Sequence, residues 1–170
     1  MKFEDSCNEI NRFISKSNGS IISLPTGEEY LFNLVNKYSI SDLSSFEMKH
    51  GIKLPEEYKH FLTKVGASKI YFDEFGLGIE FIPIEQLLDF SNKVFKGMKN
   101  PFPNILIIAS NIGRGDFISY GIDSESMQYR LATFSHEEDP ERWLEENTAW
   151  SNLKDWLVKL VETEGEEDTI

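Results

Sequence analysis

One short segment of the chain is apolar at every position. Residues 105–109 read Ile-Leu-Ile-Ile-Ala, and an unbroken run of this length is typical of a strand that is covered on both faces. Residues 117–120 and 128–132 are rich in β-forming side chains and predict the next two strands, with a turn at residues 121–126. A strand covered on both faces needs helices packed against its sheet, so the chain is expected to build both.

Residues that are typical of helix ends lie upstream of this run. Ser41 suits an N-cap, and Asp42 places negative charge at a helix N-terminus. Gly51 suits the left-handed position that ends a helix, and Pro55 suits the first residue of a new one. We therefore expect two helices joined by a tight corner, the second of them closed by Gly66.

Apolar spacing predicts the remaining elements. Apolar residues three and four apart predict helices at residues 3–16, 30–38, 84–95 and 150–161. Short β-rich runs predict strands at residues 70–72 and 78–81. Residues 21–25 fit either a strand or an extended linker.

These elements together predict the fold class. We expect a single α+β domain with a central, mostly antiparallel sheet flanked by helices. In this prediction residues 41–161 form the domain, and residues 1–40 form an N-terminal helical extension packed on it. Residues 162–170 are expected to form an acidic, frayed tail.

The charge balance narrows the class of partner. The chain carries 29 acidic and 17 basic residues, a formal net charge of −12. Direct nucleic-acid binding requires clustered Lys and Arg, and an anionic membrane repels an acidic chain, so we expect neither. An acidic surface favours a basic protein partner, because complementary fields speed association. The alternative is that the charge only keeps the protein soluble.

The sequence shows neither a membrane span nor a secretory signal. No apolar run approaches the roughly 18 residues that a spanning helix needs, and no apolar block follows the charged start of the chain. The one cysteine, Cys7, has no partner for an internal disulfide. We therefore expect a cytoplasmic protein.

Patterns that would indicate chemistry are weak. His50, His60 and His136 have no Cys or His at metal-ligand spacing, and Cys7 lacks the local signature of a nucleophile. Among so many acidic residues, pairs of carboxylates at a catalytic separation arise by accident. We therefore predict no catalytic residue, no metal site and no cofactor, and we expect a protein that is not an enzyme.

A glycine-rich segment follows the apolar run. Residues 113–116 read Gly-Arg-Gly-Asp, and consecutive backbone N–H groups in such a segment can bind an anion. The segment lacks the downstream Lys-Ser/Thr of a phosphate-binding loop. We therefore favour a tight turn between two strands, in which Asp116 accepts hydrogen bonds from backbone N–H groups.

The strongest candidate for a functional surface lies at residues 136–146. Six carboxylates surround Trp143 there, namely Glu137, Glu138, Asp139, Glu141, Glu145 and Glu146. We expect a loop between the last strand and the last helix, in which the carboxylates hold a basic partner and Trp143 anchors it. The alternative is a solvated loop whose Trp143 packs back on the domain. A second acidic pair, Asp73 and Glu74 beside Phe75, extends this surface if the fold brings the two together.

Three segments in order resemble the SUKH superfamily, which includes bacterial toxin-immunity proteins and a fungal cell-wall regulator. The first holds Phe46 and Glu47 and then a Leu-Pro-x-x-Tyr-x-x-Phe-Leu pattern at Leu54, Pro55, Tyr58, Phe61 and Leu62. The second is the run 105–109 followed by Gly113, Gly115 and Asp116, and the third is the aromatic terminal helix. We expect these motif residues to be structural. Where the family often has Asn-Gly-Gly after the first pattern, this chain has Val65-Gly66-Ala67, so we expect the turn into the first strand to differ in detail.

The resemblance implies a binding protein rather than a catalyst. Characterised immunity members of this superfamily bind and neutralise toxins, which are often nucleases. With the acidic charge, this leads us to expect an immunity-type protein that binds a cationic toxin domain, a nuclease, and blocks its active site or nucleic-acid channel. The alternatives are an intracellular scaffold or regulator with several weaker partners, and an enzyme or small-ligand binder that uses a concave sheet face.

Overall fold

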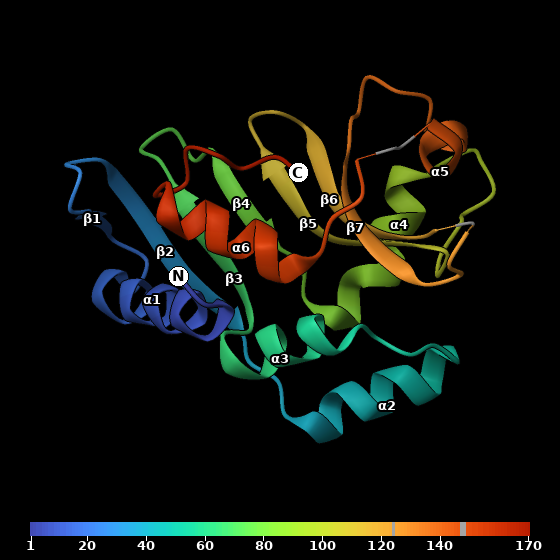
Figure 1. Ribbon diagram of the computed structural model, residues 1–170, viewed down its shortest axis with the longest axis horizontal. Coiled ribbons are helices and arrows are strands. Elements are labelled where there is room, and N and C mark those ends of the chain that lie inside the picture. The colour runs from blue at the N-terminus through green and yellow to red at the C-terminus, as the bar shows by residue number, and fades with distance from the viewer. Residues whose placement is uncertain (124, 147–148) are drawn as a thin grey trace.

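The computed structural model describes residues 1–123, 125–146 and 149–170. Within these residues seven strands form one sheet, and each strand pairs antiparallel with its neighbours in chain order (Figure 1). The strands are β1 (Ile21–Ser23), β2 (Glu29–Asn36), β3 (Ala67–Phe72), β4 (Gly78–Phe81), β5 (Ile105–Ile112), β6 (Asp116–Ile122) and β7 (Tyr129–Phe134). The sheet is therefore one meander from edge to edge.

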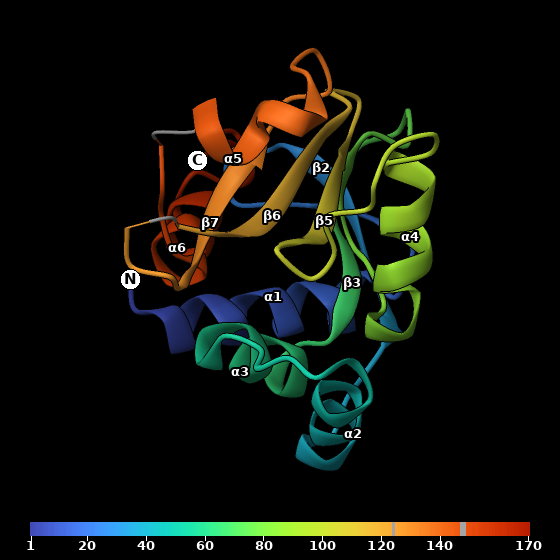
Figure 2. The same ribbon diagram turned by 90° about the vertical axis from the view of Figure 1, so that its right-hand side faces the viewer.

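Helices flank this sheet. α1 (Phe3–Ser17) and α6 (Leu153–Glu162) lie on one face, and α4 (Leu87–Val94) lies on the other (Figure 2). α2 (Ile40–His50) and α3 (Glu56–Lys64) lie at the lower end of the sheet in Figure 1, and α5 (Trp143–Glu146) follows β7 at the upper end. Short 3-10 turns, Ile84–Gln86 and Pro140–Arg142, precede α4 and α5. The predicted α+β class, with helices around an antiparallel sheet, is confirmed.

The apolar run has the predicted position in the fold. β5 contains it, and each side chain from Ile105 to Ala109 is at most 2% exposed. The strands predicted from residue 70 onward are also confirmed as β3, β4, β6 and β7. α1, α4 and α6 occupy segments that were predicted helical, although α6 begins at Leu153 instead of residue 150.

The predicted corner between α2 and α3 is confirmed, and α2 begins earlier than predicted. The N-cap of α2 is Ser39 instead of Ser41: Ser39 Oγ accepts a hydrogen bond from Asp42 N at 3.1 Å, and Asp42 Oδ2 accepts one from Ser39 N at 2.7 Å. Gly51 ends α2 in the left-handed region, with a φ of 63°. α3 begins one residue after Pro55, so glycine and proline mark the corner as the sequence indicated.

The helix expected at residues 30–38 is wrong, because these residues lie mainly in β2. β2 pairs with β1 on one side and β3 on the other, and these pairings outweigh the helical spacing. The ring of Phe32 lies 5.0 Å from the ring of Phe13 in α1, and Phe32 is fully buried. The strand interpretation of residues 21–25 is confirmed. Residues 1–40 therefore hold two strands of the shared sheet as well as a helix, and a domain boundary after them stays a prediction.

The frayed tail expected at residues 162–170 is also wrong, because the end of the chain is held against the sheet. Trp156 Nε1 donates a hydrogen bond to the backbone oxygen of Asp168 at 3.2 Å. Ile170 N donates to Thr133 Oγ1 of β7 at 3.1 Å. These contacts join the tail to α6 and to the edge of the sheet.

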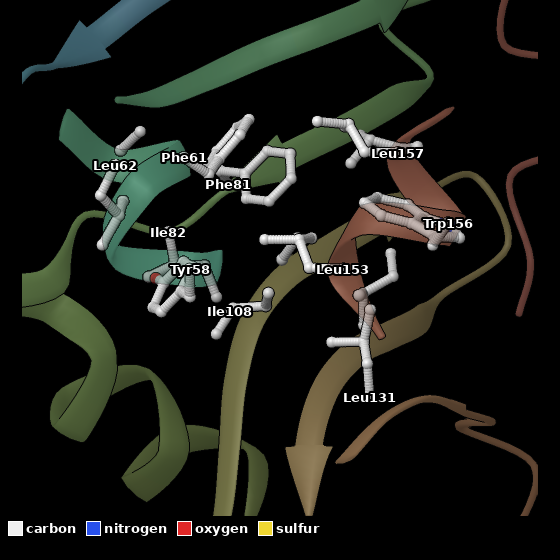
Figure 3. Close-up of a cluster of buried hydrophobic side chains, with 14 of the residues drawn as sticks. Tyr58, Phe61, Leu62, Phe81, Ile82, Ile108, Leu131, Leu153, Trp156 and Leu157 are labelled. Atoms are coloured by element: carbon white, nitrogen blue, oxygen red, sulfur yellow. The ribbon is translucent and has the colours of Figure 1, made fainter. Parts of the chain in front are cut away.

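One core joins α3, α6 and the sheet (Figure 3). Its side chains are almost fully buried, and burial of each stabilises the fold by about 1.5–3 kcal/mol. The residues labelled in Figure 3 are Tyr58, Phe61, Leu62, Phe81, Ile82, Ile108, Leu131, Leu153, Trp156 and Leu157. The centroids of the Phe61 and Phe81 rings are 4.4 Å apart, which places α3 directly on β4.

Candidate functional site

The family motif at the α2–α3 corner occupies structural positions. Glu47 Oε2 accepts a hydrogen bond from Leu54 N at 3.0 Å, and Glu47 Oε1 lies 3.6 Å from Lys59 Nζ. The aromatic and aliphatic motif residues are at most 7% exposed: Phe46, Leu54, Tyr58, Phe61 and Leu62. These side chains hold the corner and the core together, so they are not available to a partner.

The Gly-Arg-Gly-Asp segment is a tight turn between β5 and β6, as predicted. Gly113 and Gly115 have φ values of 114° and 78°, which favour glycine. A Cβ atom on Gly113 would lie 3.2 Å from the Leu77 side chain, and one on Gly115 would lie 3.0 Å from the His136 ring. Asp116 Oδ1 accepts a hydrogen bond from a backbone N–H as predicted, but the donor is His136 N in the segment after β7, at 3.3 Å. The same oxygen lies 3.1 Å from His136 Nδ1.

Trp143 is not a surface anchor. Its side chain is 1% exposed, and its ring stacks on Phe134 with centroids 5.1 Å apart. The rings of Phe95 and Phe117 lie 5.5 and 5.9 Å away. The alternative is therefore correct: Trp143 packs back on the domain, because burying an indole among aromatic rings is strongly favourable.

Four connecting segments lie at one end of the sheet, the upper end in Figure 1. They are the β1–β2 turn (residues 24–28), the β3–β4 turn (73–77), the β5–β6 turn (113–115) and the segment after β7 (135–141). An antiparallel meander places alternate connections at the same end. Leu77 lies against Gly113, and His136 lies against Gly115. The β5–β6 turn therefore contacts both the β3–β4 turn and the segment after β7. We call these four segments the turn end.

The turn end carries both acidic clusters, which lie far apart in the sequence. The exposed carboxylates of the segment after β7 are Glu137, Glu138, Asp139 and Glu141. The β3–β4 turn adds Asp73 and Glu74. Glu145 is exposed on the neighbouring α5, and the side chain of Glu146 lies outside the described residues. The two clusters therefore lie at the same end of the sheet, and their role in binding a partner stays a prediction.

Two of these acids shape the turns that carry them. Asp73 Oδ1 accepts hydrogen bonds from Phe75 N at 2.8 Å and Leu77 N at 2.9 Å. Asp139 Oδ1 accepts one from Glu141 N at 3.1 Å. Within the described residues the remaining carboxylates form no hydrogen bond or ion pair through their side chains: Glu74, Glu137, Glu138, Glu141 and Glu145. They remain available to an outside cation.

Two further carboxylates of this surface were not predicted from the sequence. Glu28 and Glu29, in and after the β1–β2 turn, add further exposed carboxylates to the turn end. They were missed because the following residues were interpreted as a helix. A signal was present, since residues 25–27 (Pro-Thr-Gly) separate two short apolar runs, a pattern typical of a hairpin.

The residues that could perform chemistry include one cysteine and three histidines. Cys7 is buried in α1, where burial raises the pKa of its thiol to about 12. The histidines lie on α2, α3 and the segment after β7. In the described part of the chain, no three His, Cys, Asp or Glu side chains are placed to hold a metal ion. The helices described there include none that is long and apolar enough to cross a membrane.

Known proteins provide independent comparisons. A family model described as SMI1-KNR4 cell-wall matches residues 40–157. Immunity protein RhsIB of Dickeya dadantii (strain 3937) is 35% identical over 162 residues, which cover 95% of this chain and 96% of the relative. No solved structure matches the chain. The similarity to the relative therefore includes the N-terminal strands and helix as well as the part that the family model covers.

Proposed function

The chain belongs to the SMI1-KNR4 cell-wall family, in the SUKH superfamily, and from this membership we propose that it is an immunity protein that binds and neutralises a toxin. The similar protein from Dickeya dadantii is named an immunity protein, and the alignment spans nearly all of both chains. The candidate functional surface consists of exposed carboxylates, which suit the binding of a partner better than catalysis. The protein acts as a binder in this proposal and not as an enzyme.

The target in this proposal is a cationic toxin domain, a nuclease. A nuclease holds its substrate with Lys and Arg side chains that neutralise phosphates, and these cations also attract an acidic protein. The observation that carries the proposal is the position of Asp73–Glu74 and residues 137–141 on the same end of the sheet. Separate stretches of chain thus carry carboxylates at the same end of the sheet. Within the described residues, the exposed Glu side chains of these stretches form no ion pair.

The mechanism has two stages. The field of the turn end first speeds the encounter with the cationic toxin, by roughly ten- to a thousand-fold at low salt. Direct contacts then exclude water and block the active site or the nucleic-acid channel of the toxin. Immunity proteins on other folds bind nuclease toxins with a Kd of about 10⁻¹³ M or lower, so tight binding by this route is physically accessible.

Capture and co-expression test this proposal. The tagged protein is used to capture partners from its host at low and high salt, and the captured toxin domain is expressed with and without the chain. We expect one basic partner in stoichiometric amount, which degrades nucleic acid and stops growth when expressed alone. A captured toxin that remains lethal beside the chain would contradict the immunity role. Several weakly held partners would favour the scaffold function instead.

A further inference from the structure

A cleft opens at the corner of the turn end that is farthest from α5, between the β1–β2 and β3–β4 turns. Its volume is about 600 Å³. Carboxylates and aromatic rings line it, principally Glu28, Glu29, Asp73, Glu74, Tyr30 and Phe75. None of its lining residues, all of them within the described part of the chain, is Lys, Arg or His. The cleft therefore combines negative charge with apolar surface.

Phe75 stands at the edge of this cleft and is 77% exposed. The turn holds its backbone in place, because Asp73 Oδ1 accepts hydrogen bonds from Phe75 N and Leu77 N. Gly76 follows with a φ of 77°, a conformation that favours glycine. A large aromatic side chain displayed on a fixed turn has apolar surface that water solvates poorly, and such residues dominate protein interfaces.

Tyr30 lies half-buried in the lining of the cleft. Its ring packs edge-on against the buried ring of Tyr71, with centroids 5.5 Å apart. Burial raises the pKa of the Tyr30 phenol, and the carboxylates of Glu28, Glu166, Asp73 and Glu164 raise it further. Acidic side chains from several segments of the chain therefore act on the phenol.

We propose that this cleft receives one arginine side chain of the cationic toxin, with the guanidinium against Phe75 and its N–H groups on Glu28 and Glu74. This inference rests on the proposed function and names the partner group that the cleft recognises. Arginine fits better than lysine because a planar guanidinium stacks on an aromatic face and donates in a fixed fork to carboxylates. The Glu28 and Glu74 side chains have no partner within the described residues, so they are free to accept these hydrogen bonds.

Two other occupants fit the cleft less well. An apolar side chain would bury the carboxylates without a countercharge, which is costly. A metal ion requires several converging ligands, and the described residues include no group of three that could hold one. The exposed Phe75 would add nothing to metal binding, whereas it adds a cation–π contact to an arginine.

A titration with a small arginine probe tests the cleft without the toxin. The probe is Nα-acetyl-arginine methylamide, followed by backbone amide NMR shifts, and the neutral control is the citrulline analogue. We expect saturable shifts at Glu28, Tyr30 and Phe75 with arginine, and an affinity that falls at least about tenfold in Phe75→Ala. Equal shifts with citrulline, or arginine shifts that are unchanged in Phe75→Ala, would overturn the proposal.

The captured toxin supplies a second and separate test. Phe75→Ala should raise the Kd for the toxin at least about thirtyfold, as the loss of an interface hot spot does. Met48→Ala is the matched control, because Met48 is an apolar side chain 83% exposed on α2, and it should leave the Kd unchanged. If the chain neutralises the toxin but Phe75→Ala binds it equally well, the cleft is wrong and the immunity role stands. If arginine binds the cleft but no toxin is neutralised, the immunity role is wrong.

Discussion

At the helix end of the sheet, formed by α2, α3 and the first turn of α1, three carboxylates are paired with lysines. Lys59 Nζ lies 3.6 Å from Glu47 and 2.6 Å from Glu56, and Lys64 Nζ lies 2.6 Å from Glu4. At the turn end the following side chains have no hydrogen bond or ion pair within the described residues: Glu28, Glu74, Glu137, Glu138 and Glu141. The same residue type is therefore used in two ways at the two ends of one sheet.

The difference shows that the net charge of −12 is not a uniform property of the surface. Glu4, Glu47 and Glu56 at the helix end have a countercharge inside the fold and contribute to it through local pairs. The five unpaired carboxylates of the turn end repel one another, although Arg114 and His136 of the same end pair with Asp168 and Asp116. Solubility alone does not require such segregation, whereas the recognition of a basic partner that we propose would be favoured by it.

The largest expected effect is a loss of folding stability when the buried ring that follows the turn end in the chain is removed. Trp143→Ala should lower the free energy of unfolding by about 3–5 kcal/mol, because it removes a fully buried ring stacked on Phe134. Chemical denaturation measures this loss. A change below about 0.5 kcal/mol, the size expected at an exposed position, would show that Trp143 does not pack as described.

A smaller effect is expected at the helix end. Glu47→Ala should lower the free energy of unfolding by about 1–3 kcal/mol, because Leu54 N loses its acceptor and Lys59 loses a partner. The neighbouring Met48→Ala, at an exposed position, should change it by less than about 0.5 kcal/mol. Equal losses in the two variants would remove the special role of Glu47.

Acidification should act on the paired carboxylates of the helix end. A hydrogen bond from Lys64 lowers the pKa of Glu4, and one from Lys59 lowers the pKa of Glu56, from the ordinary value of 4.5. A lowered pKa in the folded state means that the stabilisation is complete above 4.5 and is lost as the pH falls through the folded-state pKa. Denaturation midpoints of the wild type and of Glu4→Gln/Glu56→Gln should therefore converge at acid pH. A difference that is constant with pH would contradict this pairing.

The smallest effect, with the opposite sign, is expected at the turn end. Glu74→Gln with Glu137→Gln should leave the free energy of unfolding within about 0.5 kcal/mol of the wild type or raise it slightly, because repulsion is relieved and no pair is broken. Thermal unfolding at low salt is the measurement, since salt screens the repulsion. A clear destabilisation would show that these carboxylates do have partners in the fold.

Local signals in the sequence predicted much of the fold. The apolar run of β5, the glycine of the α2 end and Pro55 each have one favourable structural role, so the strand and the helix corner followed from them. β2 was predicted as a helix because Leu31, Leu34 and Tyr38 have helical spacing. Its pairing with β3 depends on residues 31 to 41 positions away, and no local pattern contains that information.

The candidate site was predictable in its composition and not in its geometry. The acidic clusters are visible in the sequence, but their position at the same end of the sheet depends on the order of the strands. The tail was predicted to fray because acidic termini usually do, yet Asp168 and Ile170 bond to side chains of distant strands. Trp143 resembled an exposed anchor because its sequence neighbours are charged, and only the packing of Phe95, Phe117 and Phe134 shows where it lies.

The most direct test of the account compares charge reversal at two places. Glu137→Lys/Glu138→Lys/Glu141→Lys changes the turn end, and Glu56→Lys/Asp89→Lys/Glu125→Lys makes the same change in net charge on α3, α4 and the β6–β7 turn. The measurement is the association rate with the captured toxin at low salt. We predict a loss of about tenfold or more for the turn-end variant and a much smaller loss for the other. Equal losses in the two variants would show that only the total charge matters and would contradict a binding surface at the turn end.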